Sequence, residues 1–359
     1  MRKRIIRLPL LSRILLLVLM VSTPAFAQTT PPSTPTTKST PKQIVIEIYS
    51  PPKGFTIYII SFAFAEMLNK RSSFIKASAV ETLGGPDALY AIQKLPPERR
   101  KNAITLQQET EWPRAIKGLP PYTDPIPDLR MMMTAYEYGS THHPITLDPK
   151  IKTYKDMIGK RVGTAPPGGG FNMFTQFVMK ECWGIADKVK MEYMRFDGLK
   201  QALLNGLIDV AWMPSPTGPI GKYELSPVTM EIAAMKPIYF IPTEKEDLAK
   251  GVAQSYYKPV YVTIPKGSFG KNLPQEDLPS SVIFCAWFCW KDADPEVIHE
   301  IVRIHNQFGK DFDGPLPSMA GFAANKNMMG YSKYLKEEYM HPGAVKFFKE
   351  NNLKIGIPD

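Results

Sequence analysis

The chain has 359 residues, of which 44% are hydrophobic and 22% are charged. This apolar fraction excludes a largely disordered protein, and the length is sufficient for two domains of ordinary size. Only one stretch near the N-terminus is continuously apolar, which excludes a protein with several membrane spans. The formal net charge is +10, but part of it belongs to that same N-terminal stretch.

The N-terminal segment has the pattern of an export signal. Four basic residues within the first seven precede the short apolar run Ile14–Val21, and Ala25-Phe26-Ala27 fits a small-x-small cleavage site. We therefore predict a cleaved signal peptide over residues 1–27 and a periplasmic location. Its removal takes away five basic residues and leaves a charge of +5, so we expect no nucleic-acid partner. Residues 28–43 are rich in Thr and Pro and predict a flexible linker.

The folded part is expected to begin near Ile44 and to alternate strands with helices. Apolar runs rich in β-branched residues predict strands, and helices are expected between them. The first unit has expected strands at 44–50, 74–82, 102–107 and 130–138, and expected helices at 55–70 and 84–94. This βαβ order indicates a mostly parallel sheet with helices on both faces.

A second unit of the same kind follows residue 150. A short helix and a strand are expected over 153–165, a glycine-rich loop and a helix over 166–185, and a strand at 190–196. A helix at 197–206, with Asp197 as its N-cap and Gly206 after its end, precedes a strand at 207–213. The remaining expected strands are 228–234, 237–242, 258–265 and 281–289, and the remaining helices are 244–256, 294–309 and 342–352.

Cysteine and histidine give weak chemical signals. Cys285 and Cys289 lie on one expected strand, about 13 Å apart, which is too far for a disulfide; with Cys182 they are predicted to be buried free thiols. His142 and His143 are adjacent, point to opposite sides of an extended chain and cannot easily share a metal, so we predict a surface loop there. The usual hydrolase, metalloprotease and nucleotide-binding motifs are absent from the sequence, and we expect no metal and no cofactor. A Ser/His/Asp catalytic triad, formed by residues that are distant in the sequence, remains an alternative.

Three loops that follow expected strands and open helices carry a stronger signal. They are Ser50–Thr56, Thr82–Pro86 and the glycine-rich Ala165–Asn172. A helix N-terminus offers free N–H groups and about half a positive charge, and glycine lets a ligand approach the backbone. One such loop is better explained by tight packing, but three in an exported chain of two units favour a cleft for a small anion, most simply a carboxylate.

Three segments resemble a known family. YKDMIGKRVGTAPPGGGFN, FDGLKQALLNGLIDVAWM and above all YMHPGAVKFFKENNL are similar to segments of TAXI-type solute receptors, the periplasmic binding subunits of one class of TRAP transporters. The resemblance covers roughly residues 44–355. It implies an α/β fold of the type II periplasmic binding protein class, with two α/β lobes around a ligand cleft and a hinge.

The resemblance also implies a chain that returns to its first lobe. We expect lobe I to hold 44–135 and 262–359 and lobe II to hold 139–257, with crossings near Tyr136–Gly139 and Lys258–Val262. The implied function is to capture a small organic acid and to deliver it to the membrane permease subunits of a TRAP transporter. We expect the protein itself to be a monomer and not an enzyme.

The chain departs from the family where ligand is expected to bind. Pro51 and Pro52 stiffen the first loop, and Gly169 stands where the family has a serine. Because a buried charged oxygen without a donor is costly, we expect a ligand other than glutamate, and an apolar or aromatic monocarboxylate fits better. The expected contacts lie at or beyond the carboxyl ends of strands, with the Gly170 and Phe171 N–H groups receiving the carboxylate. They are Tyr49, Phe55, Thr56, Thr82, Gly84, Gln107, Gln108, Gly169, Gly170, Phe171, Asn172, Trp212, Pro214, Ser215 and Thr217.

Two other functions remain as alternatives. One is an exported α/β hydrolase or lyase, which needs a base beside a nucleophile. The other is a periplasmic ligand-binding protein that feeds a sensor. A transport receptor needs only hydrogen-bond donors and a closing hinge, and these are what the sequence supplies.

Overall fold

The computed structural model describes residues 43–51, 56–82, 85–217, 223–270, 272–309 and 329–356. The predicted signal peptide, the predicted linker up to residue 42, and the expected contacts Phe55 and Gly84 lie outside these ranges. Within the ranges, no helix combines the length and the apolar character that crossing a membrane requires.

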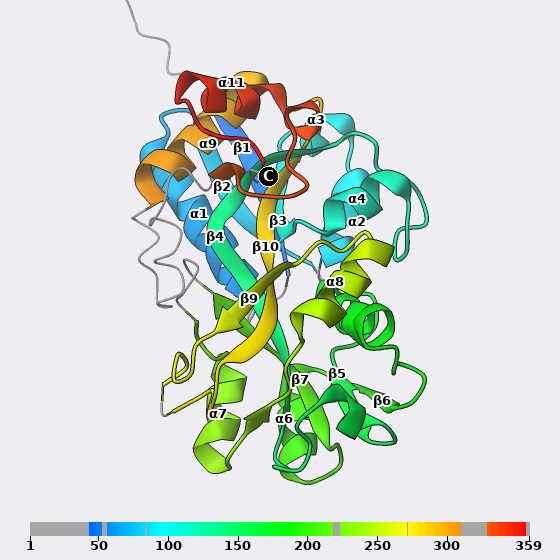
Figure 1. Ribbon diagram of the computed structural model, residues 1–359. Helices are drawn as coiled ribbons and strands as arrows, with labels where there is room; N and C mark the ends of the chain where they lie inside the picture. Colours follow the sequence, from blue (N-terminus) through cyan, green and yellow to red (C-terminus); the bar gives the residue numbers. More distant parts are fainter. Residues whose placement is uncertain are drawn as a thin grey trace, which may run out of the picture. The chain divides into compact units, whose positions relative to one another are not determined.

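The described residues form one mixed sheet with helices packed against it (Figure 1). The strands are β1 Ile44–Ser50, β2 Ile75–Glu81, β3 Ala103–Gln108, β4 Leu129–Thr146, β5 Arg161–Thr164, β6 Lys190–Tyr193, β7 Val210–Thr217, β8 Tyr239–Phe240, β9 Val260–Ile264 and β10 Leu278–Trp290. The helices are α1 Thr56–Arg71, α2 Gly85–Gln93, α3 Pro97–Arg100, α4 Glu111–Lys117, α5 Gly170–Phe177, α6 Phe196–Leu204, α7 Pro227–Met235, α8 Lys245–Gln254, α9 Pro295–Phe308 and α11 Pro342–Glu350. Shorter 3₁₀ turns span Tyr154–Met157 and Glu337–Tyr339, and a π-helical turn, Val178–Cys182, follows α5.

Two long strands, β4 and β10, connect the halves of the sheet. The strand order is β2-β1-β3-β10-β4-β7-β5-β6, with β8 beside β4 and β9 beside β10. The outer pairs β1–β2, β1–β3, β5–β6 and β5–β7 are parallel, whereas β4 and β10 run antiparallel to their neighbours. The expected βαβ order is therefore present in both halves, and hydrogen bonds join the halves into one continuous sheet.

The pairing of β4 with β10 is interrupted at one place. Phe284 pairs with Gly139, but Ala286, two residues further on, pairs with Thr134. The irregular part of β4 between these pairs coincides with the predicted first crossing at 136–139. We propose that it separates the two lobes, and that the hinge lies there.

The registers suggest a different place for the second crossing from the one expected at Lys258–Val262. β9 pairs with the Leu278–Val282 part of β10, and the adjoining part of β4 pairs with β7, so β9 belongs with the second half of the sheet. β3, in the first half, pairs with Cys285–Phe288 of β10. We therefore propose that the chain returns to lobe I through β10 itself, near Phe284–Ala286.

The hydrophobic cores follow the same division. One cluster packs α1, α2, α9 and α11 against β1, β3 and the far ends of β4 and β10, and includes Phe64, Trp287 and Phe348. Separate clusters surround β5 and β7, built around Trp212 with Phe174 on one face and Ile232 on another. Each half thus has a core of its own.

Three local predictions were wrong. Residues 228–234, expected as a strand from their β-branched side chains, belong to helix α7. Ser226 caps this helix by accepting a hydrogen bond from the Thr229 N–H, and Pro227 occupies its first position; these start signals outweigh β propensity. The N-cap of α6 is Arg195, so Asp197 lies inside the first turn.

The third error concerns the two adjacent histidines. His142 and His143 are not in a surface loop but in β4, and they are 4% and 2% exposed. Burial lowers the pKa of each to about 3, so both rings are neutral near pH 7. The histidines do point to opposite sides, as expected: His142 contacts Phe171 and Phe174, whereas His143 contacts Phe240 and Phe269. The three cysteines are buried free thiols, which confirms that prediction.

Candidate functional site

The carboxyl ends of the parallel strands of both halves meet near the middle of β4 and β10. β3 ends at Gln108, which pairs with Cys285, and β7 ends at Thr217, which pairs with Gly139. Gly139 in turn pairs with Phe284, the neighbour of Cys285. The strand ends of the two halves therefore converge on the place where α/β sheets bind ligands.

Helix α5 begins at this place, directly after the glycine-rich loop. Its N-cap, Gly169, has an extended backbone and no side chain to accept hydrogen bonds from the first N–H groups. Thr164 and Thr175 join the end of β5 to the helix by a hydroxyl–hydroxyl hydrogen bond of 3.0 Å. Asn172 donates to the Ala165 carbonyl at 3.0 Å. The loop is thus held by its own polar side chains, while the first N–H groups of α5 depend on partners outside the helix.

Residues from the other half of the sheet lie directly against the first residue of α5. A Cβ on Gly170 would lie 2.9 Å from Oε1 of Gln108 and 3.4 Å from Oε1 of Glu111. Both oxygens are buried and lack a hydrogen-bond partner. The structure thus brings together Gly169, Gly170 and Gln108, three of the residues expected in the site.

Gln107 lies on the other side of β3, because successive side chains of a strand point to opposite faces. It is 2% exposed and donates to Thr105 Oγ1 at 2.7 Å, and its Oε1 would lie 3.0 Å from a Cβ on Gly85 at the start of α2. Thr105 donates to the backbone carbonyl of Tyr49 at 2.7 Å, and the Tyr49 ring packs in the core of that half. Gln107 therefore lies at the start of α2, on the opposite face of β3 from Gln108, and Tyr49 belongs to the core of the same half.

Thr82 follows β2 and is tied to β1. Its N–H and its hydroxyl both donate to the Ser50 carbonyl, at 2.8 and 2.9 Å. This fixes the carboxyl ends of β1 and β2 to each other. Thr56 is the first residue of α1.

Aromatic rings form a wall behind the start of α5. Phe171 is partly buried and lies 4.5 Å from the His142 ring, measured between centroids. Trp212 of β7 is fully buried and packs against Phe174 and Trp183. Phe171 is thus partly exposed in the first turn of α5, whereas Trp212 lies in the core behind the helix. The Nδ1 atom of His142 is buried and has no hydrogen-bond partner.

The end of β7 provides polar groups at the junction of the halves. Ser215 is 1% exposed and its hydroxyl has no partner, while its carbonyl accepts a hydrogen bond of 3.0 Å from the Thr141 hydroxyl. Pro214, between Ser215 and the buried Met213, is partly buried, and Thr217 is buried. The expected contacts from β7 therefore lie beside β4, at residues that pair with Gly139–His142.

Glu111, absent from our expected contacts, is one of two buried acids at the end of β3. It is 1% exposed, and its Oε2 accepts a hydrogen bond of 2.8 Å from the Tyr122 hydroxyl. Burial raises the pKa of Glu111, whereas Arg114 and the Tyr122 hydroxyl lower it. The rule that selected the two glutamines, polar residues at the carboxyl end of a strand, extends to this acid as well.

Glu109 is the second acid, and it faces the β10 crossing. Its N–H donates to the Phe284 carbonyl at 3.0 Å, and its carboxyl group accepts from Ser332, with Lys333 nearby. Glu109 is 1% exposed, and burial raises its pKa to about 8. Near pH 7 this side chain is mostly a neutral carboxylic acid.

Arg114 connects the two halves at the edge of the site. From α4, its Nη1 donates to the Tyr257 hydroxyl at 2.9 Å and approaches the Met173 sulfur at 3.1 Å. Its guanidinium also lies over the Tyr257 ring, 5.4 Å from the centroid. Met173 belongs to α5 and Tyr257 follows α8, so one side chain of the first half contacts two segments of the second.

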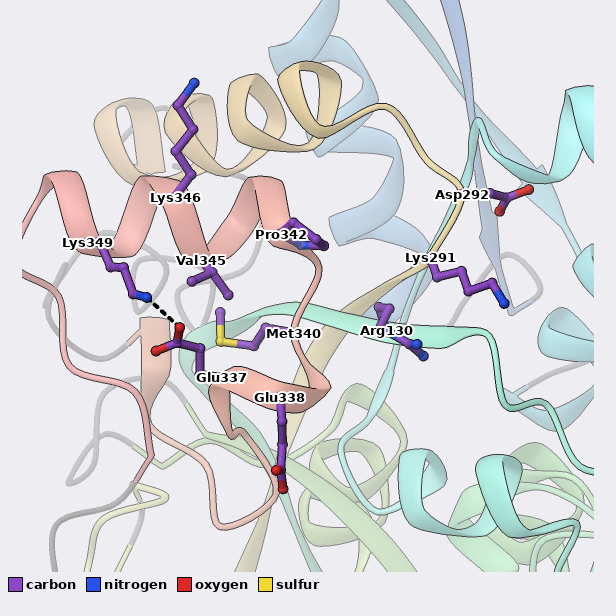
Figure 2. Close-up of a pocket in the computed structure, with 10 residues that line it drawn as sticks. All are labelled: Arg130, Lys291, Asp292, Glu337, Glu338, Met340, Pro342, Val345, Lys346 and Lys349. Carbon is purple, nitrogen blue, oxygen red and sulfur yellow. Dashed lines mark hydrogen bonds and ion pairs between the residues drawn. The ribbon is translucent and has the colours of Figure 1, made fainter.

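A shallow groove of about 790 Å³ lies elsewhere, over the start of α11, and none of the expected contacts lines it. Figure 2 shows Met340, Pro342 and Val345 within it and charged side chains around them. Lys349 pairs there with Glu337, and other rim lysines pair with acids nearby. The groove therefore lacks the concentration of one charge that a site for a small ion requires.

A family model described as the NMT1-like family matches residues 48–351. The chain belongs to the NMT1-like family. The structure is also similar to solved periplasmic proteins. A putative sulfonate ABC transporter protein, the periplasmic sulfonate-binding protein SsuA from Methylobacillus flagellatus KT, has a TM-score of 0.50 and 12% identity, with 89% of this chain and 98% of that chain covered.

Two further solved structures have lower scores. MatC from Rhodopseudomonas palustris, with bound malate, has a TM-score of 0.48 and 10% identity, covering 86% of this chain and 96% of that one. A TctC solute-binding protein from Polaromonas has a TM-score of 0.44 and 15% identity, covering 77% and 86%. At these identities the likeness concerns the fold. This member of the NMT1-like family has the α/β fold of periplasmic solute-binding proteins, as expected.

Proposed function

We propose that this protein is an exported, periplasmic solute receptor that captures a small organic acid and delivers it to a membrane permease. The observation that carries the proposal is the start of α5. Its first N–H groups lack a side-chain cap and lie at the meeting point of the strand ends of both halves, against Gln108. A helix N-terminus in such a place favours a carboxylate.

The proposed contacts of the ligand follow from the side chains around that helix. The N–H groups of Gly170 and Phe171 receive the carboxylate, Gln108 hydrogen-bonds the polar part, and the Phe171 ring covers the apolar part. Asn172 supports the loop through Ala165 and is a positioning residue rather than a contact. An apolar or aromatic monocarboxylate remains the expected ligand class, in preference to glutamate.

Closure of the two lobes is the second part of the proposal. The interrupted pairing of β4 and β10 supplies a place to bend, and Arg114 supplies contacts to Tyr257 and Met173 that exist only when the halves meet. A ligand held by both halves stabilises the closed state through contacts that the open state lacks. Small-angle scattering should therefore show a smaller radius of gyration at saturating ligand.

The transport partner is proposed from the sequence. The resemblance to TAXI-type receptors supports a TRAP-type permease as the recipient. A permease gene adjacent to the gene for this chain would support a transport role, and an adjacent sensor-kinase gene would favour signalling.

The binding proposal is tested by a thermal-shift screen followed by calorimetry. The panel contains apolar and aromatic monocarboxylates, dicarboxylates, glutamate, and the sulfonates of matching carbon skeleton. We expect the tightest binding from a monocarboxylate and weak or absent binding of glutamate. Binding of sulfonates alone, or of no acid in the panel, would contradict the proposal, and tight glutamate binding would contradict only the ligand preference.

A further inference from the structure

A buried acid, Glu109, lies at the proposed bend between the two halves. It follows β3, is 1% exposed, and its N–H donates to the carbonyl of Phe284 at 3.0 Å, where the pairing of β10 with β4 is interrupted. One oxygen of its carboxyl group, Oε2, is buried without a hydrogen-bond partner. A carboxylate here would be a buried charge with an unsatisfied oxygen, which is costly, so the position suits the neutral acid.

The segment 330–334, which we call the strap, covers this acid. Ser332 is fully buried and donates a hydrogen bond to the Glu109 carboxyl group. At one end the strap is anchored to the first half, because the Gly330 carbonyl accepts from the Gly356 N–H at 2.9 Å and the residues before Gly356 pack against the core of that half. The cover of Glu109 therefore begins in the half to which the acid belongs.

The strap also contacts the second half, on both sides of Ser332. The Tyr334 hydroxyl donates to the carbonyl of Tyr256, which follows α8. The Tyr331 ring packs against the hydrophobic cluster of β9 and the adjoining part of β10. Separation of the halves would therefore break contacts on both sides of the residue that covers Glu109.

The charges around Glu109 do not compensate its burial. Within the described ranges, the titratable groups beside it come from the strap and β10, and they are Lys333, Tyr334 and Cys285. Burial raises the pKa of the tyrosine and of the cysteine, so both are neutral near pH 7, and the lysine is exposed and attracts a carboxylate only weakly. On the acid's own segment, Glu111 and Arg114 interact with each other and with Tyr257. Burial therefore outweighs these charges and raises the pKa of Glu109.

We propose that Glu109 and the strap form a proton-sensitive latch, in which the neutral acid holds the halves closed and its ionisation favours the open state. This inference rests on lobe closure, the second part of the proposed function. In the open state the acid faces water and has its ordinary pKa, so opening releases one proton. Between about pH 4.5 and about pH 8, the ratio of open to closed protein therefore rises with pH, by up to about tenfold per pH unit.

Small-angle scattering of the ligand-free protein tests the latch, with the proton as the probe. The radius of gyration of the wild type should increase between about pH 5 and about pH 8, while circular dichroism shows an intact fold at both. Glu109→Gln is neutral at every pH, so its radius should stay at the value that the wild type has at the lower pH. The control Glu98→Gln, at an exposed acid that pairs with Lys101, should respond to pH as the wild type does.

A second variant tests the strap independently of the acid. Tyr334→Phe removes the hydroxyl that reaches the Tyr256 carbonyl and leaves the ring in place. Its radius of gyration at the lower pH should exceed that of the wild type at the same pH, because the strap no longer holds the second half. This variant and the wild-type titration decide the proposal even if Glu109→Gln does not fold.

The outcomes separate the latch from the proposed function. A wild-type radius that does not change with pH overturns the latch, and so does a pH response that persists in a folded Glu109→Gln protein. A Tyr334→Phe radius equal to that of the wild type overturns it as well. If a saturating acid from the panel still reduces the radius in any of these cases, the receptor that closes on its ligand stands and the latch alone is wrong.

Discussion

Replacement of Gly170 by alanine separates the binding role of this residue from any role in folding. The added Cβ would lie 2.9 Å from Oε1 of Gln108, closer than unstrained contacts allow, and 3.4 Å from Oε1 of Glu111. The atom it meets is the far end of a flexible side chain, so Gln108 can move aside at little cost. Alanine also favours the helical backbone over glycine by about 0.5–1 kcal/mol. The free energy of unfolding of Gly170→Ala should therefore lie within about 1 kcal/mol of wild type.

Binding should respond very differently in this variant. The methyl group occupies the space in front of the α5 N–H groups and displaces the Gln108 amide, so we expect at least a tenfold loss of affinity, about 1.4 kcal/mol. The matched control is Gly169→Ala, one residue earlier, where a Cβ meets nothing within 4 Å. Calorimetry with the tightest acid of the panel, together with urea denaturation, measures both quantities. Wild-type affinity in a fully folded Gly170→Ala protein would refute the placement of the ligand at this helix.

Three further predictions concern packing, protonation and closure. Gly343→Ala should lower the free energy of unfolding by about 1–3 kcal/mol in urea denaturation, because its Cβ would meet the backbone oxygen of Pro295 at 2.1 Å; a loss no larger than that of Gly169→Ala would contradict this. Glu109 keeps a proton in the folded state up to about pH 8 that the unfolded chain releases above about 4.5, so stability falls as pH rises through this window. Glu109→Gln should reduce that decline, by at most about 1.4 kcal/mol per pH unit, in urea titrations at several pH values; an unchanged pH slope would contradict it. Arg114→Lys should enlarge the radius of gyration of the ligand-free protein, since one ammonium cannot replace the guanidinium contacts across the halves; an unchanged radius would count against the closure role.

The sequence segments that carried the family resemblance turn out to specify the fold rather than the ligand. In YMHPGAVKFF, His341 caps α11 by accepting from the Gly343 N–H at 3.2 Å, and Gly343 allows α11 to approach Pro295. In GLIDVAWM, Asp209 accepts hydrogen bonds from the Arg161 backbone and guanidinium at 2.7–3.1 Å and ties β5 to β7. Caps and close contacts recur wherever the same elements pack, so such segments predict the architecture well.

The site was harder to predict because it is made by tertiary contacts. The glycine-rich loop and the strand ends identified Gly170 and Gln108, and these do meet. The strand-end rule extends to Glu111 only if the chain after β3 turns back to the sheet, and helix α4, which makes that turn, was not expected. The burial of His142 was missed for a related reason. Two polar residues before a proline, here His142 and His143 before Pro144, are typical of a loop, and the sequence does not show that β4 continues through them.

Hydrogen–deuterium exchange with and without the tightest-binding acid tests the central claim most directly. A ligand held between α5 and the end of β3 should slow exchange in two peptides that are distant in sequence, 168–174 and 106–112, while exchange around the groove at 337–349 stays constant. Protection confined to the groove, or to one half of the sheet, would contradict a binding site formed by both.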